Sequence, residues 1–221
     1  MINWTIQVGD ETTSAIYDAT TDGETSTVFV CAHGAGGNMH DRGMVATTRA
    51  LGARGLAIVR FNFLYKEKRS SRPDPMPKLE DTTAAVVARV RDELQPKRII
   101  IGGRSMGGRA ASMLAADGFD ASGLFLLAYP LHPPGRPEQL RDAHLPSIRM
   151  PVLCVNGTRD PFCTPALMTG VLERVTSPWQ MMWIEGADHS FHVLKSSGKT
   201  DAQVIGEIAD AGAAWASALP T

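Results

Sequence analysis

Six short apolar segments of this chain run directly into glycine-rich or polar turns, and helical patterns follow most of them. In residues 98–118 the apolar run Ile99-Ile100-Ile101 meets a cluster of glycines, and a small-residue helical pattern begins at once. The other apolar segments are residues 27–37, 56–63, 122–130, 152–163 and 179–191. Short apolar strands that alternate with helices form parallel sheets covered on both faces. The order of segments therefore predicts an α/β fold with a mostly parallel, twisted sheet.

The rest of the chain fits this reading without a domain boundary. Two short strands are expected first, at residues 2–8 and 14–20, and the main helices at 41–55, 79–96, 106–118, 165–175 and 201–219. Long polar connections are expected at residues 64–78 and 131–151, and neither is long enough to form a large cap domain. A chain of 221 residues suits one hydrophobic core. We therefore predict a single domain over residues 1–221.

Composition narrows the possible partners and the compartment. The formal net charge of −1 gives no global field that would recruit nucleic acid or a membrane surface. No apolar run approaches the length of a membrane span, and the first residues lack the pattern of a signal peptide. Three cysteines cannot all pair with one another, which favours a reduced chain. We expect a cytoplasmic protein, and its oligomeric state stays open.

Four strand ends carry residues suited to chemistry. They read HGAGG at 33–37, GRSMG at 103–107, GTRDP at 157–161 and GADHSF at 186–191. In open parallel sheets, ligands bind outside the carboxyl ends of the strands. The sequence therefore predicts one site that combines a hydroxyl, a carboxylate, an imidazole and flexible backbone.

Ser105 is the candidate nucleophile. GRSMG has the G-x-S-x-G form of a nucleophile elbow, and it lies between an expected strand and an expected helix. Gly103 and Gly107 would let neighbouring backbone approach where a Cβ would clash. The helix that begins near Met106 would direct its free N–H groups at the site and favour developing negative charge. A simple strand–helix turn is the structural alternative.

His189 is the candidate base for that serine. It lies in a loop after a late strand, and it follows the serine and an acid in the chain order known for this kind of elbow. His192 is an alternative, although it already begins the next element. His33 ends an early strand and is expected to shape its loop. The other three histidines are expected to be surface or packing residues: His40, His132 and His144.

Asp160 is the candidate carboxylate that orients the base. It follows a buried strand and precedes a helix, where a loop or helix-capping role is its structural alternative. Asp188 is the rival, but as the immediate neighbour of His189 it would reach the ring Nδ1 with poor geometry. Shaping the loop is therefore the expected role of Asp188.

Backbone N–H groups are expected to complete the site. The Met106 N–H follows the nucleophile, and the HGAGG turn would supply a second donor, from Ala35 first and from Gly36 second. HGAGG could also suggest phosphate binding, but neither of the usual phosphate-loop patterns accompanies it. No clustered metal-ligand spacing is present. We therefore expect no metal and no cofactor.

Taken in this order, the four motifs resemble the α/β-hydrolase superfamily over nearly the whole chain. Within it the chain is similar to the small capless enzymes grouped with dienelactone hydrolase. It is more similar still to bacterial relatives of a eukaryotic testis-expressed protein, with GGRSMGGR as the most specific part. The resemblance implies a triad of Ser105, His189 and Asp160, with oxyanion donors at Met106 and near Ala35. Serine replaces the cysteine nucleophile of dienelactone hydrolase proper, which argues against a dienelactone substrate.

The expected activity is hydrolysis of a small ester through an acyl-enzyme. Acyl transfer, thioester cleavage and peptide cleavage by the same residues are alternatives, and so is a non-enzymatic interaction module on the same fold. Met106 and Phe162 are candidate walls of the substrate pocket, whereas Tyr65 and Tyr129 would either line it or pack on the sheet. The basic loop residues are expected to be solvated, with anion binding as the alternative: Lys66, Lys68, Arg69 and Arg72.

Overall fold

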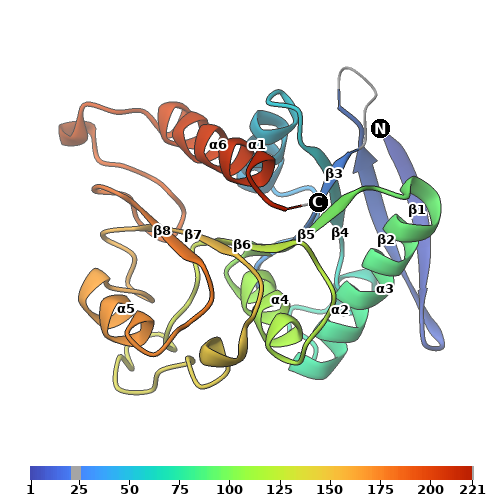
Figure 1. Cartoon of the computed structure of the whole chain (residues 1–221), viewed down its shortest axis with the longest axis horizontal. Coiled ribbons are helices and arrows are strands. Elements are labelled where there is room, and N and C mark those ends of the chain that lie inside the picture. The colour runs from blue at the N-terminus through green and yellow to red at the C-terminus, as the bar shows by residue number, and fades with distance from the viewer. Residues whose placement is uncertain (21–25, 221) are drawn as a thin grey trace.

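The computed structural model describes residues 1–20 and 26–220, and all the strands named in these ranges form one twisted sheet (Figure 1). Its order is β1-β2-β4-β3-β5-β6-β7-β8. The strands are β1 (Ile2–Val8), β2 (Glu11–Asp18), β3 (Thr27–Ala32), β4 (Ala57–Phe61), β5 (Arg98–Arg104), β6 (Gly123–Leu127), β7 (Val152–Gly157) and β8 (Trp179–Ile184). Strand β2 runs antiparallel to both of its neighbours, and β4 through β8 pair in parallel. The expectation of a mostly parallel sheet is therefore confirmed.

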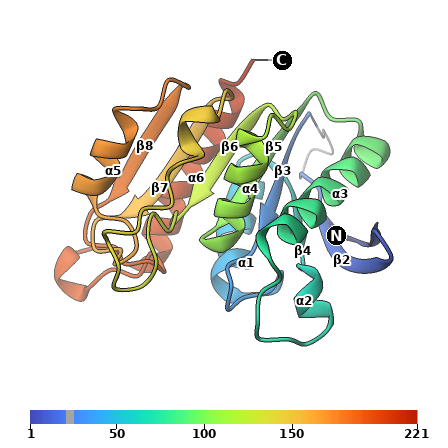
Figure 2. The same ribbon diagram turned by 90° about the horizontal axis from the view of Figure 1, so that it is seen from below.

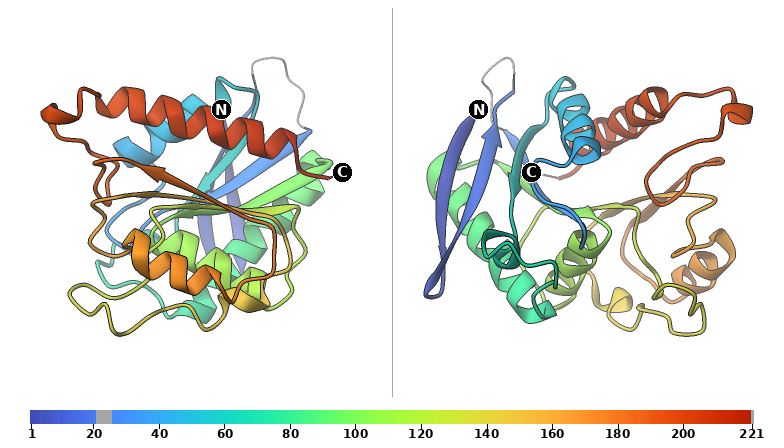
Figure 3. Two further views of the ribbon diagram at one scale, coloured as in Figure 1. Left: turned by 60° about the vertical axis from the view of Figure 1, so that its left-hand side comes forward. Right: turned by 180° about the vertical axis from the view of Figure 1, so that it is seen from behind.

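Helices cover both faces of this sheet. Helices α1 (Arg42–Gly52) and α6 (Asp201–Ser217) lie together on one face (Figure 1). Helices α3 (Met76–Leu94), α4 (Met106–Ala116) and α5 (Pro165–Leu172) lie on the other, which Figure 2 shows from below. Figure 3 shows the same two helical layers on either side of the strands. The fold class inferred from the alternation of segments is confirmed.

Strand β3 contributes side chains to the hydrophobic core on both faces of the sheet. All six of its residues are buried, because the strand lies inside the sheet with helices on both faces. Val28 and Val30 pack into the core beneath α3 and α4, whereas Phe29 and Cys31 pack into the core beneath α1 and α6. Successive side chains of a strand point to opposite faces. A continuous apolar run is therefore what a strand buried on both sides requires.

The connection 64–78 departs from its expected form as a polar loop. Its first residues form the short helix α2 (Leu64–Glu67), and α3 begins at Met76 rather than at 79. Leu64 and Tyr65 are buried, and Glu67 accepts hydrogen bonds from the backbone of Ser14 and from Asn62. The apolar pair at the start of the segment therefore anchors α2 on the sheet, although charged residues surround it in sequence.

No inserted cap domain interrupts the described chain. The connection between β6 and β7 contains only one short 3-10 helix, η1 (Leu145–Ser147), and a second one, η2 (Lys195–Ser197), precedes α6. The strand ends after β3, β5, β7 and β8 therefore open on one side without a covering domain. Within the described ranges, no helix is long and apolar enough to cross a membrane.

Candidate active site

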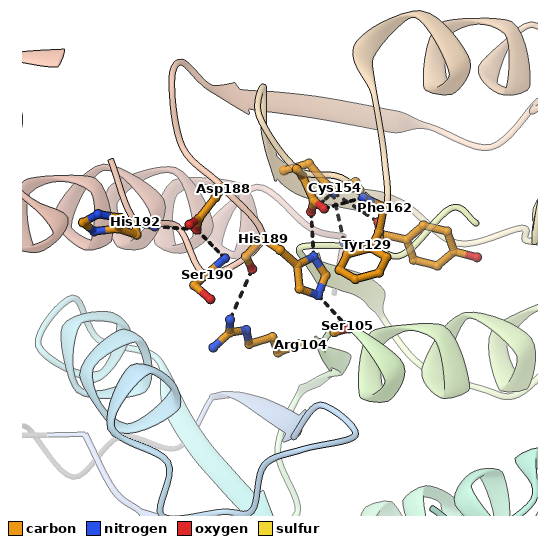
Figure 4. Close-up of polar contacts among 11 residues, drawn as sticks. Arg104, Ser105, Tyr129, Cys154, Phe162, Asp188, His189, Ser190 and His192 are labelled. Carbon is orange, nitrogen blue, oxygen red and sulfur yellow. Dashed lines mark hydrogen bonds and ion pairs between the residues drawn. The ribbon is translucent and has the colours of Figure 1, made fainter. Parts of the chain in front are cut away.

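Three side chains from the ends of β5, β7 and β8 meet at the carboxyl edge of the sheet. Ser105 follows β5, Asp160 lies in the loop after β7, and His189 lies in the loop after β8. His189 Nε2 lies 2.9 Å from Ser105 Oγ, and His189 Nδ1 lies 2.8 Å from Asp160 Oδ2. Figure 4 shows the imidazole between the serine and the loop after β7. The structure thus brings together the three side chains that the sequence singled out.

The backbone around Ser105 is bent as an elbow. Ser105 has φ 51° and ψ −116°, an unusual conformation for a residue with a side chain. Its N–H donates to the Leu127 carbonyl at 2.9 Å, which ties the turn to the end of β6. A Cβ on Gly103, whose φ is +139°, would lie 2.2 Å from the Ala32 carbonyl oxygen. A Cβ on Gly107 would lie 2.6 Å from the His33 carbonyl oxygen, so both glycines are needed for this packing.

The hydrogen-bond pattern fixes the proton positions on His189. An ionised carboxylate only accepts, so the ring Nδ1–H donates to Asp160 and Nε2 is left to accept from the Ser105 hydroxyl. The His189 side chain is 20% exposed, whereas that of Asp160 is fully buried. The Phe162 ring meets the imidazole edge-on, with 4.5 Å between the ring centroids. The imidazole is therefore held on one side and open toward the serine on the other.

Three donors hold the buried Asp160 carboxylate. Oδ2 accepts from His189 and from Asn156 Nδ2, the latter at 3.2 Å, and Oδ1 accepts from the Phe162 N–H at 2.9 Å. Asn156 is itself fixed, because it exchanges hydrogen bonds with the backbone of Tyr129. A buried charge needs such partners. Reading the sequence missed Asn156, whose only signal is a polar amide inside the apolar run of β7.

Arg104 and Gly157 hold the His189 loop in place, and neither was assigned a role from sequence. The Arg104 guanidinium donates to the His189 carbonyl oxygen at 3.2 Å (Figure 4). A Cβ on Gly157 would lie 2.1 Å from the Ala187 carbonyl oxygen. The absence of a side chain at Gly157 therefore allows the loop to pack against the end of β7. The sequence signals for these roles were the position of Gly157 at the end of a strand and that of Arg104 directly before the candidate nucleophile.

The alternative histidines and the alternative acid have other partners. Asp188 accepts from the N–H groups of Ser190 and His192, so it shapes the loop, as expected. The exposed His192 ring contacts Asp201, which raises the pKa of His192. His33 is buried, and its Nε2 accepts from the Phe63 N–H. Burial lowers the pKa of His33. Within the part of the chain that the structure describes, His189 is the histidine that forms a hydrogen bond with Ser105.

The two expected backbone donors flank the serine. Met106 is the first residue of α4, and Ala35 is an exposed central residue of a turn closed by the Gly37 N–H and the Gly34 carbonyl. The Tyr65 hydroxyl donates to the Ala35 carbonyl at 2.7 Å and so fixes this peptide segment. Among the described residues, no backbone hydrogen bond uses the Ala35 or Met106 N–H. Both groups are free to bind a ligand.

A cavity of about 400 Å³ opens beside Ser105. A volume in this range suits a small organic ligand. Met106 and Phe162 are among its walls, as the sequence predicted, whereas Tyr65 and Tyr129 are buried and pack against the sheet. The cavity is lined by Ala35, Pro73, Asp74, Met76, Leu79, Ser105, Met106, Arg109, Pro130, Pro134, Arg141 and Phe162.

The basic residues of connection 64–78 do not reach this cavity. Lys68 pairs with Glu11, and Lys66 lies over the Tyr65 ring at 5.1 Å from its centroid. None of the four basic residues named in the sequence is a cavity wall. Two arginines from elsewhere, Arg109 and Arg141, do line it, and neither was assigned a role from the sequence. In residues 1–20 and 26–220, no cluster of side chains could hold a metal ion.

Comparison with known proteins shows which family this chain belongs to. A family model for an α/β hydrolase domain matches residues 25–217. The fold is similar to an α/β serine hydrolase homologue from Coxiella burnetii, at 22% identity and a TM-score of 0.77 over 95% of this chain and 96% of that one. A dienelactone hydrolase from Anabaena variabilis gives 19% identity and a TM-score of 0.77 over 100% and 98%.

A serine hydrolase without a lid, from Xanthomonas campestris, gives 22% identity and a TM-score of 0.76 over 100% of this chain and 95% of that one. These TM-scores show a common fold despite the low sequence identities, and the absence of a lid in that relative matches the uncovered strand ends seen here. The family model spans most of the sequence, including all four motifs. The chain therefore belongs to the α/β-hydrolase family.

Proposed function

We propose that this protein is a serine hydrolase that cleaves small carboxylic esters through a covalent acyl-enzyme. The observation that carries the proposal is the continuous chain of hydrogen bonds from Asp160 through His189 to Ser105. Ser105 is also a wall of the cavity beside it, so a bound ester would meet its hydroxyl. The hydrolase family of the chain supports the same chemistry.

In the first half of the reaction, His189 Nε2 takes the Ser105 proton as Oγ attacks the ester carbonyl. The distance of 2.9 Å between these atoms suits that transfer. His189 then gives the proton to the departing alcohol, and the acyl group stays on Ser105. In the second half, His189 takes a proton from water as the water attacks the acyl group, and Ser105 recovers its proton as the acid is released. No atom beyond those of ester and water is consumed.

Negative charge that develops on the carbonyl oxygen needs donors that are already in place. The Met106 N–H at the start of α4 and the Ala35 N–H in the turn after β3 fill this role in the proposal. The Tyr65 contact to the Ala35 carbonyl supports the orientation of that turn. The unusual backbone of Ser105 keeps its hydroxyl at the helix start.

Asp160 stays ionised and fixes the imidazole in the tautomer that can accept the serine proton. The carboxylate is buried and accepts hydrogen bonds from Asn156 and the Phe162 N–H as well, which fixes its orientation toward the ring. It also stabilises the imidazolium that forms during each proton transfer. We further propose the single-domain organisation over residues 1–221 expected from sequence.

The first test is covalent labelling with a fluorophosphonate probe, followed by mass spectrometry of the adduct. We expect the probe on Ser105 in native protein and no adduct in the Ser105→Ala variant. Heat-denatured protein serves as the control, because labelling there would report ordinary reactivity rather than an activated serine. Native protein that stays unlabelled, while a panel of small esters also stays intact, would overturn the proposed function.

A further inference from the structure

Two guanidinium groups line the cavity beside Ser105, and the proposed chemistry uses neither. Arg109 comes from α4 and Arg141 from the connection between β6 and β7, so two separate elements place positive charge in one small cavity. Charged groups are costly to hold in a partly buried wall unless something pairs with them. Their surroundings therefore indicate what the cavity binds.

Arg109 lies one helical turn after Ser105. Its N–H donates to the Ser105 carbonyl at 2.9 Å, and residues four apart lie on the same helix face. The Arg109 Nε is buried and has no hydrogen-bond partner. No protein acceptor therefore holds this side of the guanidinium, and Arg109 lines the same cavity as the serine.

Arg141 is held by its backbone. Its N–H donates to the Leu131 carbonyl at 2.7 Å, and its carbonyl accepts from the Tyr129 hydroxyl at 2.9 Å. The backbone of Arg141 is therefore fixed at the cavity although the surrounding connection is long. Burial lowers the pKa of the Arg141 guanidinium, and the Arg109 charge lowers it further. The two cations repel each other, and an anion between them would relieve that repulsion.

The nearby acids do not neutralise this pair. Asp74 also lines the cavity, where its Oδ2 accepts from the Tyr65 N–H at 2.8 Å, but one carboxylate offsets the charge of only one of the two arginines. Glu80 interacts with the Arg109 charge only at longer range, and burial raises its pKa. Among the described residues, no ion pair within 4.0 Å joins either arginine to an acid. The cavity therefore keeps an excess of positive charge and free guanidinium donors.

Building on the proposed function, we propose that Arg109 and Arg141 bind a carboxylate of the substrate, so that the enzyme prefers small esters that carry a free carboxylate. Guanidinium groups match carboxylates in charge and in bidentate geometry. A cavity of about 400 Å³ has room for one short chain between the ester carbonyl and that carboxylate. The reaction itself remains hydrolysis, with water as the only co-reactant.

The test compares anionic and neutral esters of matched length. Monomethyl glutarate carries the carboxylate on the acyl side and is compared with dimethyl glutarate. The 4-acetoxybutanoate ion carries it on the alcohol side and is compared with pentyl acetate. We expect wild-type protein to have the higher kcat/KM for at least one anionic ester. Arg141→Met should lower the ratio of anionic to neutral kcat/KM by about tenfold or more, because a hydrogen bond to a charged group is lost.

Arg109→Met should lower the same ratio, and Arg141→Lys should restore part of it. Arg136→Met is the matched control, because Arg136 is an exposed arginine of the same connection and is not a cavity wall. Thermal melts establish whether each variant folds. If Arg109→Met does not fold, the Arg141 variants are sufficient for the test. A ratio at or below one for both pairs in wild type, or a ratio that Arg141→Met leaves unchanged, would overturn the inference.

A binding measurement separates this inference from the proposed hydrolase function. Glutarate is titrated into Ser105→Ala protein by NMR, with and without Arg141→Met. If glutarate binding to the Ser105→Ala protein requires Arg141 but wild-type protein hydrolyses no ester, the anion site is supported and the hydrolase function is contradicted. Hydrolysis without a preference for anionic esters and without glutarate binding would support the hydrolase function and contradict the anion site.

Discussion

Among the described residues, two serine–histidine pairs have similar distances but differ in burial and in the direction of the hydrogen bond. Ser105 Oγ lies 2.9 Å from His189 Nε2, and Ser112 Oγ lies 2.8 Å from His144 Nε2. The two serines are seven residues apart, at the start of α4 and within it. A hydrogen bond between a serine and a histidine is therefore no sufficient sign of a reactive hydroxyl.

The direction of the proton distinguishes the pairs. The Ser112 hydroxyl donates its only proton to the Arg109 carbonyl at 2.8 Å, so His144 Nε2–H must donate to Ser112. In the other pair His189 Nε2 accepts, because Asp160 holds the proton on Nδ1. Ser112 is also fully buried. The comparison teaches that the carboxylate and the open cavity, rather than the serine–histidine contact, define the candidate nucleophile.

Removing each serine hydroxyl should give the largest contrast. We expect Ser105→Ala to lower kcat on small esters by about 10⁵-fold or more, because the nucleophile is lost. Ser112→Ala should keep a kcat close to that of wild type and instead lose about 1 kcal/mol of folding free energy, since it removes the nearer of the two hydroxyl groups that contact His144 Nε2 and leaves that of Tyr129 at 3.5 Å. Steady-state kinetics and urea denaturation of both variants measure the two effects. A large loss of kcat in folded Ser112→Ala would contradict the assignment.

Replacing the carboxylate should make the first pair behave more like the second. We expect Asp160→Asn to lower kcat by about 10³- to 10⁴-fold, because the amide no longer selects the accepting tautomer of His189. Asp188→Asn is the matched control, since an amide oxygen can still accept from the Ser190 and His192 N–H groups. Kinetics at saturating ester compare the variants. If Asp188→Asn had the larger effect, the orienting role would pass to Asp188.

The smallest expected effect is a pH dependence of stability. Burial lowers the pKa of His144 to about 4. Between that pKa and the ordinary histidine pKa, the unfolded chain binds a proton that the folded chain does not, so His144 destabilises the fold as pH falls. We expect His144→Gln to flatten the decrease in Tm between pH 7.5 and pH 5.

His192 supplies a control of opposite sign for that measurement. Its contact with Asp201 raises its pKa, so its stabilising contribution is complete below the ordinary histidine pKa and is lost as pH rises through the higher folded value. His192→Gln should therefore steepen the decrease in Tm on acidification. Thermal melts at both pH values report the slopes, and a slope that changes in the same direction for both variants would contradict this account.

The sequence predicted the sheet and the position of the reactive side chains because both depend on local patterns. Buried strands need continuous apolar runs, and the carboxyl ends of parallel strands fall on one edge, so Ser105, Asp160 and His189 could be expected to converge. The spacing of GRSMG also predicted the close packing at Gly103 and Gly107, which the positions of the missing Cβ atoms confirm. The catalytic roles of these residues stay predictions.

The features that were missed depend on contacts between distant segments. Arg109 and Arg141 lie in different elements, and only the folded connection between β6 and β7 places both in one cavity wall. Helix α2 was missed because its burial depends on Leu64 and Tyr65, whereas charged residues dominate its sequence neighbourhood. Asn156 was missed because its partners, Tyr129 and Asp160, come from two different segments.

The contact between Arg104 and the His189 carbonyl has a consequence for how the site responds to thermal motion. Arg104 is covalently adjacent to Ser105, and it holds the backbone of His189, a residue 85 positions further along the chain. We expect this tether to couple displacements of the loop after β8 to displacements of the elbow, because one hydrogen bond joins the two backbones. The distance between Ser105 and His189 should then vary less than the position of the loop itself.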